Sequence, residues 1–280
     1  MNDVHPPMTA VREVVGRALN EDLGPLGDVT GALIPVDVHA RGHLVAREEG
    51  VLAGRLAAAE TFAQVDPAVV VSWTLDDGEE LQADMSIATV EGPLASVLAA
   101  ERTALNLLCH LSGVASITKR YVRATAGHAR IRDTRKTTPG LRALEKAAVR
   151  AGGGVNHRGS LSDGVLVKDN HLAGLSIEAA VRRAHLRWPA RSVQVECDTK
   201  EQLEEALAAG AELVLLDNMG PSEVAECVKL VDGRCLVEVS GTITIESVGA
   251  YADAGADLIS VGAITHSAPV LDIGLDLEEV

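Results

Sequence analysis

Aromatic residues are almost absent from this chain: Phe, Trp and Tyr together make up 2% of its 280 residues. The core must therefore consist of Leu, Val, Ile and Ala, and few rings remain on which nucleic-acid bases could stack. Basic residues are also in deficit, since 25 Lys and Arg stand against 40 Asp and Glu, and the pI is near 5.0. Both shortages argue against a protein that binds nucleic acid.

The chain has only four cysteines, Cys109, Cys197, Cys227 and Cys235, and no C-x-x-C pair or zinc-finger spacing among them. We interpret them as reduced thiols that pack as small hydrophobes, which predicts a cytoplasmic protein. Cys197 follows Glu196 and could be a nucleophile. No base adjoins it in the sequence, however, which favours a structural role.

Long apolar runs are missing as well. The stretch around Val97 is interrupted by Glu101 and Arg102, so we expect no membrane-spanning segment and no membrane partner. The first ten residues lack a basic segment followed by an apolar one, which argues against a secretory signal peptide.

The order of the expected elements divides the chain into two parts. Apolar residues recur at helical spacing over 9–23, and short β-like runs surround one helix between 42 and 85. A longer helix is expected over 94–111, with Gly113 placed to end it. Beyond it, helical segments alternate with unbroken Val-, Ile- and Leu-rich runs at 129–134, 163–169, 192–198, 212–218, 235–241 and 257–262. Such runs are typical of strands buried on both faces and predict an α/β barrel of about six parallel strands.

Each of these runs is followed by polar residues or glycine. The residues are Arg135–Lys136, Lys168–Asp169, Glu196, Asp217–Asn218, Ser240–Gly241 and Gly262. Because barrel enzymes carry their active sites at the carboxyl ends of the strands, the pattern predicts one site there.

The stretch from Arg130 to His171 inverts the sign of the chain's charge. It has nine Lys and Arg against four Asp and Glu, about +5 in a chain of net charge −15. A local inversion indicates an anion site, although a solvated basic face is the commoner explanation. We expect Arg135, Lys136, Arg158 and Lys168, with His157, to form a cationic wall, and Gly152, Gly153 and Gly154 to let backbone approach a ligand. Some of these cations could instead pair with Asp133, Asp163 or Asp169.

The other strand ends predict further chemistry. Glu196 and Asp217 could bind ribose hydroxyls, hold Mg²⁺ or stabilise a developing cation, whereas Asp198 and Thr199 are better placed to cap the next helix. Ser240, Gly241, Gly262 and His266 follow the last two strands, where barrels bind phosphate. Lys168 could also act as a Schiff-base nucleophile.

Several segments resemble the quinolinate phosphoribosyltransferase family, the decarboxylating nicotinate-nucleotide pyrophosphorylases. They are RDTRKTTPGLRALEKAAVRAGGGVNHR, LVKDNH, VECD, LLDN, EVSG and VGAITHSAPVLDIGLDL, together with EDLGPLGDVT, REEGVLAG and ERTALNLLCHLSG. The resemblance covers nearly the whole chain. It implies an N-terminal α+β sandwich-like domain (1–112), joined by the C-terminal tail (268–280), and an incomplete α/β barrel (113–267).

The resemblance also implies the reaction. Quinolinate and 5-phosphoribosyl 1-pyrophosphate would give nicotinate mononucleotide, pyrophosphate and CO₂, with Mg²⁺ carried mainly by the substrate near Glu196 and Asp217. The protein would be a homodimer in which Arg102 reaches the partner's site.

The family likeness assigns roles to individual positions. Those implied to hold the quinolinate carboxylates are Arg102, Arg135, His157, Arg158 and Lys168. Lys136 would lie between them and the pyrophosphate, and Glu196 and Asp217 would lie near the ribose and the metal. The phosphate positions would be Ser240, Gly241, Gly262 and His266. Of all these residues, Lys136, Lys168, Glu196 and Asp217 are expected to be catalytic.

Three alternatives remain open at this level. The same fold could act on another pyridine or aromatic acid, or the chain could be a Schiff-base aldolase that uses Lys168. A non-catalytic barrel would not need charged strand ends, so the retained charges favour an enzyme.

Overall fold

The computed structural model describes residues 4–278, and the chain forms two compact units. The first unit contains the residues up to Lys119, the segment Thr137–Gly153 and the residues from Ile264 onwards. The second contains Arg120–Lys136 and Gly154–Ala263. These units divide the chain differently from the predicted domains, because the segment 137–153 groups with the first unit. The carboxylate of Glu145 in that segment lies 2.9 Å from His110 Nε2, which ties the segment to the long helix of the first unit.

The first unit is built on a four-stranded antiparallel sheet with the strand order β12-β1-β5-β3. Its sheet strands are β1 (His39–Ala46), β3 (Val70–Trp73), β5 (Ser86–Pro93) and β12 (Ile273–Leu277), and a small ribbon pairs β2 (Gly50–Val51) with β4 (Glu80–Leu81). Its helices are α1 (Met8–Leu23), η1 (Gly31–Leu33), α2 (Arg55–Val65), α3 (Leu94–Ala124) as far as Lys119, α4 (Arg142–Ala151) and most of α9 (Ala263–His266). The C-terminal strand pairs with β1, Gly42 facing Leu277, which confirms that the tail returns to the N-terminal sheet.

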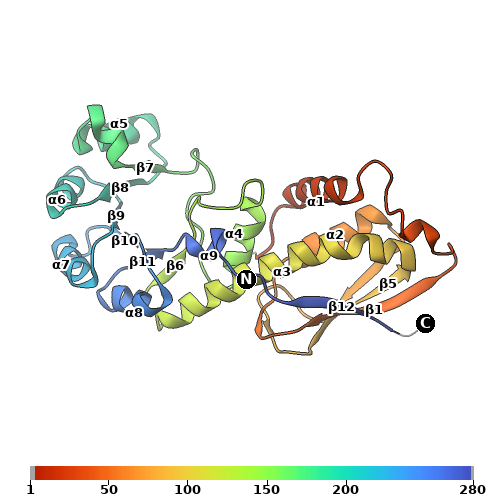
Figure 1. Ribbon diagram of the computed structural model, residues 1–280. Helices are drawn as coiled ribbons and strands as arrows, with labels where there is room; N and C mark the ends of the chain where they lie inside the picture. The colour runs from red at the N-terminus through yellow and green to blue at the C-terminus, as the bar shows by residue number, and fades with distance from the viewer. Residues whose placement is uncertain (1–3, 279–280) are drawn as a thin grey trace. The chain divides into compact units, whose positions relative to one another are not determined.

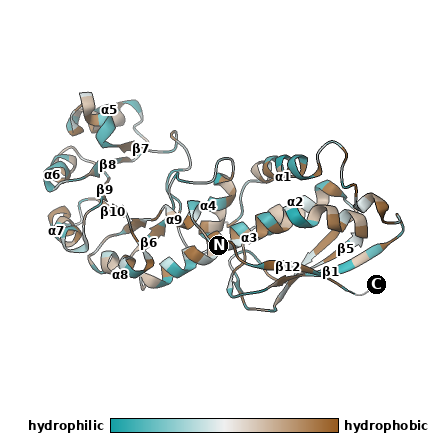
Figure 2. Ribbon diagram, viewed as in Figure 1, coloured by the Kyte–Doolittle hydropathy of each residue, from teal (hydrophilic) through white to brown (hydrophobic). Residues whose placement is uncertain are grey.

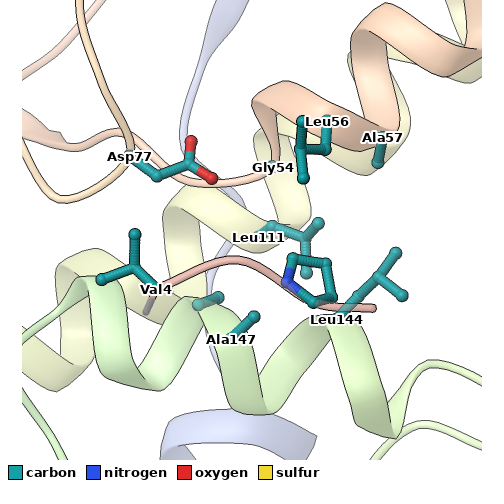
Figure 3. Close-up of a pocket in the computed structure, with 10 residues that line it drawn as sticks. Val4, Gly54, Leu56, Ala57, Asp77, Leu111, Leu144 and Ala147 are labelled. Carbon is teal, nitrogen blue, oxygen red and sulfur yellow. The ribbon is translucent and has the colours of Figure 1, made fainter. Parts of the chain in front are cut away.

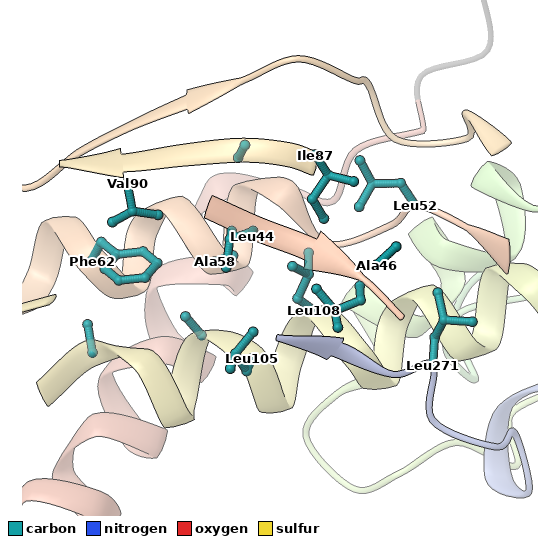
Figure 4. Close-up of a cluster of buried hydrophobic side chains, with 14 of the residues drawn as sticks. Leu44, Ala46, Leu52, Ala58, Phe62, Ile87, Val90, Leu105, Leu108 and Leu271 are labelled. Atoms are coloured by element: carbon teal, nitrogen blue, oxygen red, sulfur yellow. The ribbon is translucent and has the colours of Figure 1, made fainter. Parts of the chain in front are cut away.

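One apolar core lies between this sheet and its helices (Figure 4). Phe62, the only phenylalanine of the chain, is 1% exposed and lies near Val90 in Figure 4. The rest of the cluster is aliphatic, including Leu44, Ile87, Leu105 and Leu108. The near absence of aromatic residues in the sequence thus has the expected consequence for the core.

The prediction that Gly113 ends a helix is wrong. Helix α3 runs through this glycine to Ala124 and is 31 residues long. A Cβ atom at Gly113 would clash with the backbone carbonyl of Pro269. The glycine is therefore a point of close approach between helix and chain, which spacing along the sequence cannot distinguish from a helix stop.

The second unit contains the six parallel strands that the sequence predicted (Figure 1). They form one sheet in the order β6-β11-β10-β9-β8-β7. Its strands are β6 (Arg130–Arg132), β7 (Val165–Val167), β8 (Val193–Cys197), β9 (Leu213–Asp217), β10 (Leu236–Ser240) and β11 (Leu258–Ser260). Between them lie η2 (Asp169–Gly174), α5 (Ile177–Arg187), α6 (Lys200–Ala208), α7 (Pro221–Val231) and α8 (Ile245–Asp253). The four helices α5 to α8 alternate with the strands from β7 to β11, which confirms the expected α/β order.

The helices α5 to α8 lie along one side of these strands (Figure 1). Their ribbons alternate between hydrophilic and hydrophobic stretches in Figure 2, as helices with one buried face do. Because the strands are parallel and in register, for example Ser240 beside Asp217, their carboxyl ends meet along one edge. That edge carries the polar residues singled out in the sequence.

Within residues 4–278, no helix combines the length and the apolar character that crossing a bilayer would need.

Candidate active site

A cavity of about 370 Å³ opens at the carboxyl edge of the parallel sheet, and all its lining residues belong to the second unit. The lining residues are Thr134, Arg135, Lys136, His157, Arg158, Leu166, Lys168, Glu196, Leu215, Asp217, Ser240 and Ser260. Eight of the residues predicted from the sequence therefore lie around one space. They come from the ends of β7, β8, β9 and β10 and from the segments after β6 and before β7.

Two arginines mark the basic side of this pocket. Arg135 lies in the segment after β6. Arg158 donates a hydrogen bond of 3.2 Å from its Nη1 to the carbonyl of Gly164. Burial, and then the neighbouring charge of Arg135, lower the pKa of the Arg158 guanidinium. Two like charges held this close favour an anion between them, and a guanidinium pairs well with carboxylate or phosphate.

Lys168 and Glu196 form an ion pair across the neighbouring strands β7 and β8. The Glu196 carboxylate is 8% exposed, whereas 42% of the Lys168 side chain is exposed. Glu196 does not cap the following helix, because Thr199 does so through a reciprocal contact with Gln202. A Schiff base would need the Lys168 nitrogen to attack a carbonyl, whereas in this structure that nitrogen is engaged by Glu196.

Hydrogen bonds join the carboxyl ends of β9 and β10. Asn218 has a positive φ of 57° and donates its backbone N–H to the carbonyl of Ser240 at 3.0 Å, and its side-chain amide donates to Asp217. Gly241 has φ +131°, and a Cβ there would lie 2.7 Å from Asn218 Oδ1. Only glycine fits at position 241, so the backbone after Ser240 is fixed beside Asp217.

The pocket supplies few ligands for a metal. Among residues 4–278, no cluster of three or more His, Cys, Asp and Glu side chains could hold an ion. Glu196 and Asp217 are the two carboxylates that line the pocket. Mg²⁺ commonly uses one or two carboxylates together with substrate phosphates and water, and this pair fits that manner of binding.

Four predicted residues are not among those that line the cavity. Gly241 and Gly262 directly follow β10 and β11 in the second unit. Arg102 is exposed on α3, and His266 is exposed at the end of α9, where its Nδ1 lies 2.7 Å from Ser267 Oγ. Arg102 and His266 both belong to the first unit.

Two of the glycines between the basic segments have roles in the packing and end of a helix. A Cβ at Gly152 would clash with the carbonyl of Ala115 on α3, and Gly153 has a left-handed φ of +87° just after α4. Gly152 lets two helices approach and Gly153 ends one of them. Their spacing alone could not separate these roles from close approach to a ligand.

Sequence reasoning missed the buried polar residues in contact with the pocket lining. Glu238 on β10, Gln194 on β8 and Ser260 on β11 are each at most 6% exposed. One signal could have found them: Gln194 and Glu238 stand two residues before Glu196 and Ser240, and a period of two places both members of each pair on one face of a strand.

Two other cavities lack these features. The smaller, in the first unit, is enclosed by apolar residues such as Leu56, Leu111 and Leu144, with Asp77 as its one charged lining residue (Figure 3). A wider groove of about 800 Å³ runs along β7 and α5 in the second unit. Its lining is apolar and arginine-rich and contains no carboxylate.

Cys197 is completely buried, and burial raises its pKa to about 12. All four cysteines are free thiols. A thiol that is neutral at physiological pH is a poor nucleophile, which agrees with the structural role expected for Cys197.

Comparison with known proteins gives one consistent family. Two family models match the chain: quinolinate phosphoribosyl transferase, N-terminal domain, over residues 28–112, and the C-terminal domain over residues 114–276. The nicotinate-nucleotide pyrophosphorylase (carboxylating) of Mycobacterium leprae is 45% identical over 278 residues, which is 96% of this chain and 97% of the relative. A probable nicotinate-nucleotide pyrophosphorylase (carboxylating) of Bacillus subtilis is 41% identical, over 95% of this chain and 93% of its own length.

Solved structures agree with the sequence comparisons. The nicotinate-nucleotide pyrophosphorylase of Francisella tularensis superposes with a TM-score of 0.94 at 36% identity, with 99% of each chain covered.

Proposed function

Because this chain belongs to the quinolinate phosphoribosyl transferase family, we propose that the pocket at the carboxyl edge of the parallel sheet is its active site. The enzyme is a pentosyltransferase: it joins the phosphoribosyl group of 5-phosphoribosyl 1-pyrophosphate to quinolinate, and releases pyrophosphate and CO₂. The product, nicotinate mononucleotide, leads to NAD. The observation that carries the proposal is the convergence of Arg135, Arg158 and Lys168 on one cavity with Glu196 and Asp217.

Quinolinate has two carboxylates, which match the basic side of the pocket. Arg135 and Arg158 bind carboxylate through paired N–H donors, and Lys168 adds a compact charge. His157 lines the same pocket. Lys136 follows Arg135 and lies between the quinolinate carboxylates and the leaving pyrophosphate. The like charges of Arg135 and Arg158 favour binding of the dianion over a neutral ring.

Glu196 and Asp217 act on the ribose. As pyrophosphate departs, positive charge develops on the ribose, and two carboxylates at the ends of adjacent strands stabilise it. The same two residues would hold Mg²⁺ that arrives with the pyrophosphate group, where the ion supplies charge neutralisation. Ser240, Gly241 and Gly262 bind the 5′-phosphate, with Gly241 fixed beside Asn218 so that backbone N–H groups can approach it.

No side chain forms a covalent intermediate in this proposal. The pocket orients quinolinate so that its ring nitrogen attacks the ribose as pyrophosphate leaves. The resulting ring cation stabilises the electron pair left at C2 when the adjacent carboxylate departs as CO₂, and a proton from water then bonds to C2. Catalysis therefore consists of positioning and electrostatic stabilisation. Lys136, Lys168, Glu196 and Asp217 are the catalytic residues in this sense.

We also propose a homodimer in which Arg102 of one protomer completes the site of the other. This arginine is exposed on α3, whereas every lining residue of the pocket lies in the second unit. An exposed guanidinium is suited to bind a substrate carboxylate in a neighbouring subunit. The four free cysteines support a cytoplasmic location for this assembly.

A single assay tests the proposed reaction. Purified protein is incubated with Mg²⁺, 5-phosphoribosyl 1-pyrophosphate and either quinolinate or nicotinate, and nucleotide and CO₂ are measured. Equal amounts of nucleotide and CO₂ from quinolinate, with none from nicotinate, are expected. Folded protein that is inactive with quinolinate would rule the proposal out and direct the search to other aromatic acids.

A further inference from the structure

A buried carboxylate contacts the substrate pocket from the interior of the sheet. Glu238 lies on β10 and is 0% exposed, yet it touches two residues that line the pocket, His157 and Ser260. It is absent from the set of residues that would touch substrate. Burial of a charged carboxylate costs free energy unless its oxygens accept hydrogen bonds. The donors around Glu238 therefore indicate its role.

Each oxygen of Glu238 faces two donors. Oε2 accepts from Arg132 Nη1 at 2.7 Å and from Gln194 Nε2 at 2.7 Å. Oε1 accepts from the hydroxyl of Ser260, and His157 Nε2 lies 3.6 Å from it. Glu238 therefore joins β6, β8 and β11 to the segment that carries His157. Its negative charge is balanced directly by Arg132.

The other ring nitrogen of His157 fixes the position of the ring's proton. The backbone N–H of Arg158 points at His157 Nδ1 over 2.7 Å. An N–H group can only donate, so Nδ1 is the acceptor and has no proton. The proton of the uncharged ring is then on Nε2, the nitrogen that faces Glu238. In this geometry the ring carries its proton on the side that faces Glu238.

Glu238 also acts on the backbone before His157. Arg132, held by Glu238, donates from Nη2 to the carbonyl of Asn156 at 3.2 Å. Asp133, which is fully buried, accepts from the Asn156 side chain at 2.6 Å and from the backbone N–H of His157 at 2.8 Å. Glu238 therefore holds the turn at 156–157 indirectly, through Arg132, and Asp133 holds it by direct hydrogen bonds.

We propose that Glu238 is a positioning residue: its charge faces the Nε2–H of His157 and its partner Arg132 holds the carbonyl of Asn156, and together these contacts keep His157 in one orientation and in the Nε2–H tautomer beside the quinolinate carboxylates. This inference rests on the proposed function of the pocket, since it assigns a purpose to the orientation of His157. A carboxylate that faces one nitrogen of an imidazole favours the tautomer with the proton on that nitrogen.

The direct test of the tautomer uses the enzyme without substrate. Nitrogen-15 NMR of histidine-labelled protein, with the His157 signals assigned by their loss in His157→Ala, reports which ring nitrogen carries the proton. The Nε2–H tautomer is expected. A ring protonated on Nδ1, alone or together with Nε2, would overturn the proposal. This readout remains valid even if quinolinate is not the substrate, and it needs no Glu238 variant to fold.

The kinetic test uses Glu238→Gln, which keeps the side chain's shape and replaces one acceptor oxygen by a donor amide. The KM for quinolinate should rise about tenfold, while the KM for 5-phosphoribosyl 1-pyrophosphate stays unchanged. Glu226→Gln, an exposed glutamate of α7 that pairs with Lys200, is the matched control and should change neither constant.

A double variant separates positioning from plain structural support. If Glu238 acts through His157, Glu238→Gln should raise the KM little further in a His157→Ala background. An equal rise in both backgrounds would mean that Glu238 supports only the barrel, and would overturn the proposal. A normal KM for quinolinate in His157→Ala alone would show that His157 has no role in binding quinolinate, and would overturn the proposal. A wild-type enzyme inactive with quinolinate would instead refute the proposed function, and the NMR result would still hold.

Discussion

Lys168, directly after β7, and Glu196 on β8 pair with each other in the pocket at the carboxyl edge of the parallel sheet, so each side chain is oriented without a bound ligand. The pair joins a nearly buried carboxylate to a partly exposed cation. In the proposed function it also couples the quinolinate side of the pocket to the ribose side.

Removal of the lysine should therefore affect both activity and stability. Lys168→Met is expected to abolish turnover. It should also lower the free energy of unfolding by roughly 1–2 kcal/mol, because Glu196 loses its cation. This loss is smaller than for a fully buried pair, because 42% of the Lys168 side chain is exposed. Urea unfolding measures this change. Lys168→Met/Glu196→Gln should regain most of the stability and stay inactive, and a double variant as unstable as the single one would contradict the pairing.

Arg135 should be essential to catalysis and dispensable for folding, because it is an exposed side chain at the rim of the pocket. Arg135→Ala is expected to reduce kcat/KM for quinolinate by about 100-fold or more, with an unchanged thermal midpoint. Arg182→Ala removes an exposed arginine of α5 that does not line the pocket, and provides the charge-matched control. Near-normal activity of Arg135→Ala would remove this residue from the site.

A shared active site predicts rescue between two inactive variants. Arg102→Ala and Lys168→Ala should each be inactive alone. After unfolding and refolding together, about a quarter of all sites would be intact, because half of the dimers pair the two variants and each such dimer has one complete site. Activity of the mixture measures the rescue. Dimers shown by mass spectrometry to be mixed, yet inactive, would count against the shared site.

Replacement of Gly113 by alanine should destabilise the protein, although a Gly→Ala change inside a helix usually stabilises it. Gly113→Ala is expected to lower the thermal midpoint, because the added methyl group would clash with the Pro269 carbonyl where the chain turns toward β12. Gly16→Ala in α1 is the control, since a Cβ there would lie 3.6 Å from its nearest neighbour, Gln64. That substitution should stabilise by about 0.5–1 kcal/mol. Stabilisation at both positions would show that the close approach at Gly113 is not tight.

Cys197 should be the slowest of the four thiols to react. Burial raises its pKa to about 12, so almost no thiolate is present at pH 8, whereas Cys109 and Cys235 are only half-buried. Treatment with iodoacetamide at pH 8, followed by peptide mass spectrometry, measures the order of modification. All four thiols should react in guanidinium. Rapid labelling of Cys197 in folded protein would indicate a reactive role that its burial excludes.

The sequence by itself determined the parallel barrel sheet and most of the pocket. Apolar runs such as Val193–Cys197 and Leu213–Asp217 predict both a strand and the position at which it ends. Because the strands are parallel, their ends bring Glu196 and Asp217 to the same edge of the sheet. The local charge inversion in turn selected Arg135, Arg158 and Lys168. These inferences succeeded because period, burial and strand direction are local properties that the chain carries along its length.

Only the tertiary structure decided which residues face one another. The sequence cannot show that Gly113 meets Pro269 or that Gly152 meets Ala115, because these approaches join segments distant along the chain. Nor can it show that Glu238, inside an apolar strand, gathers donors from Arg132, Gln194 and Ser260. A buried carboxylate persists only where several elements converge to satisfy it, and that convergence exists only in the folded chain.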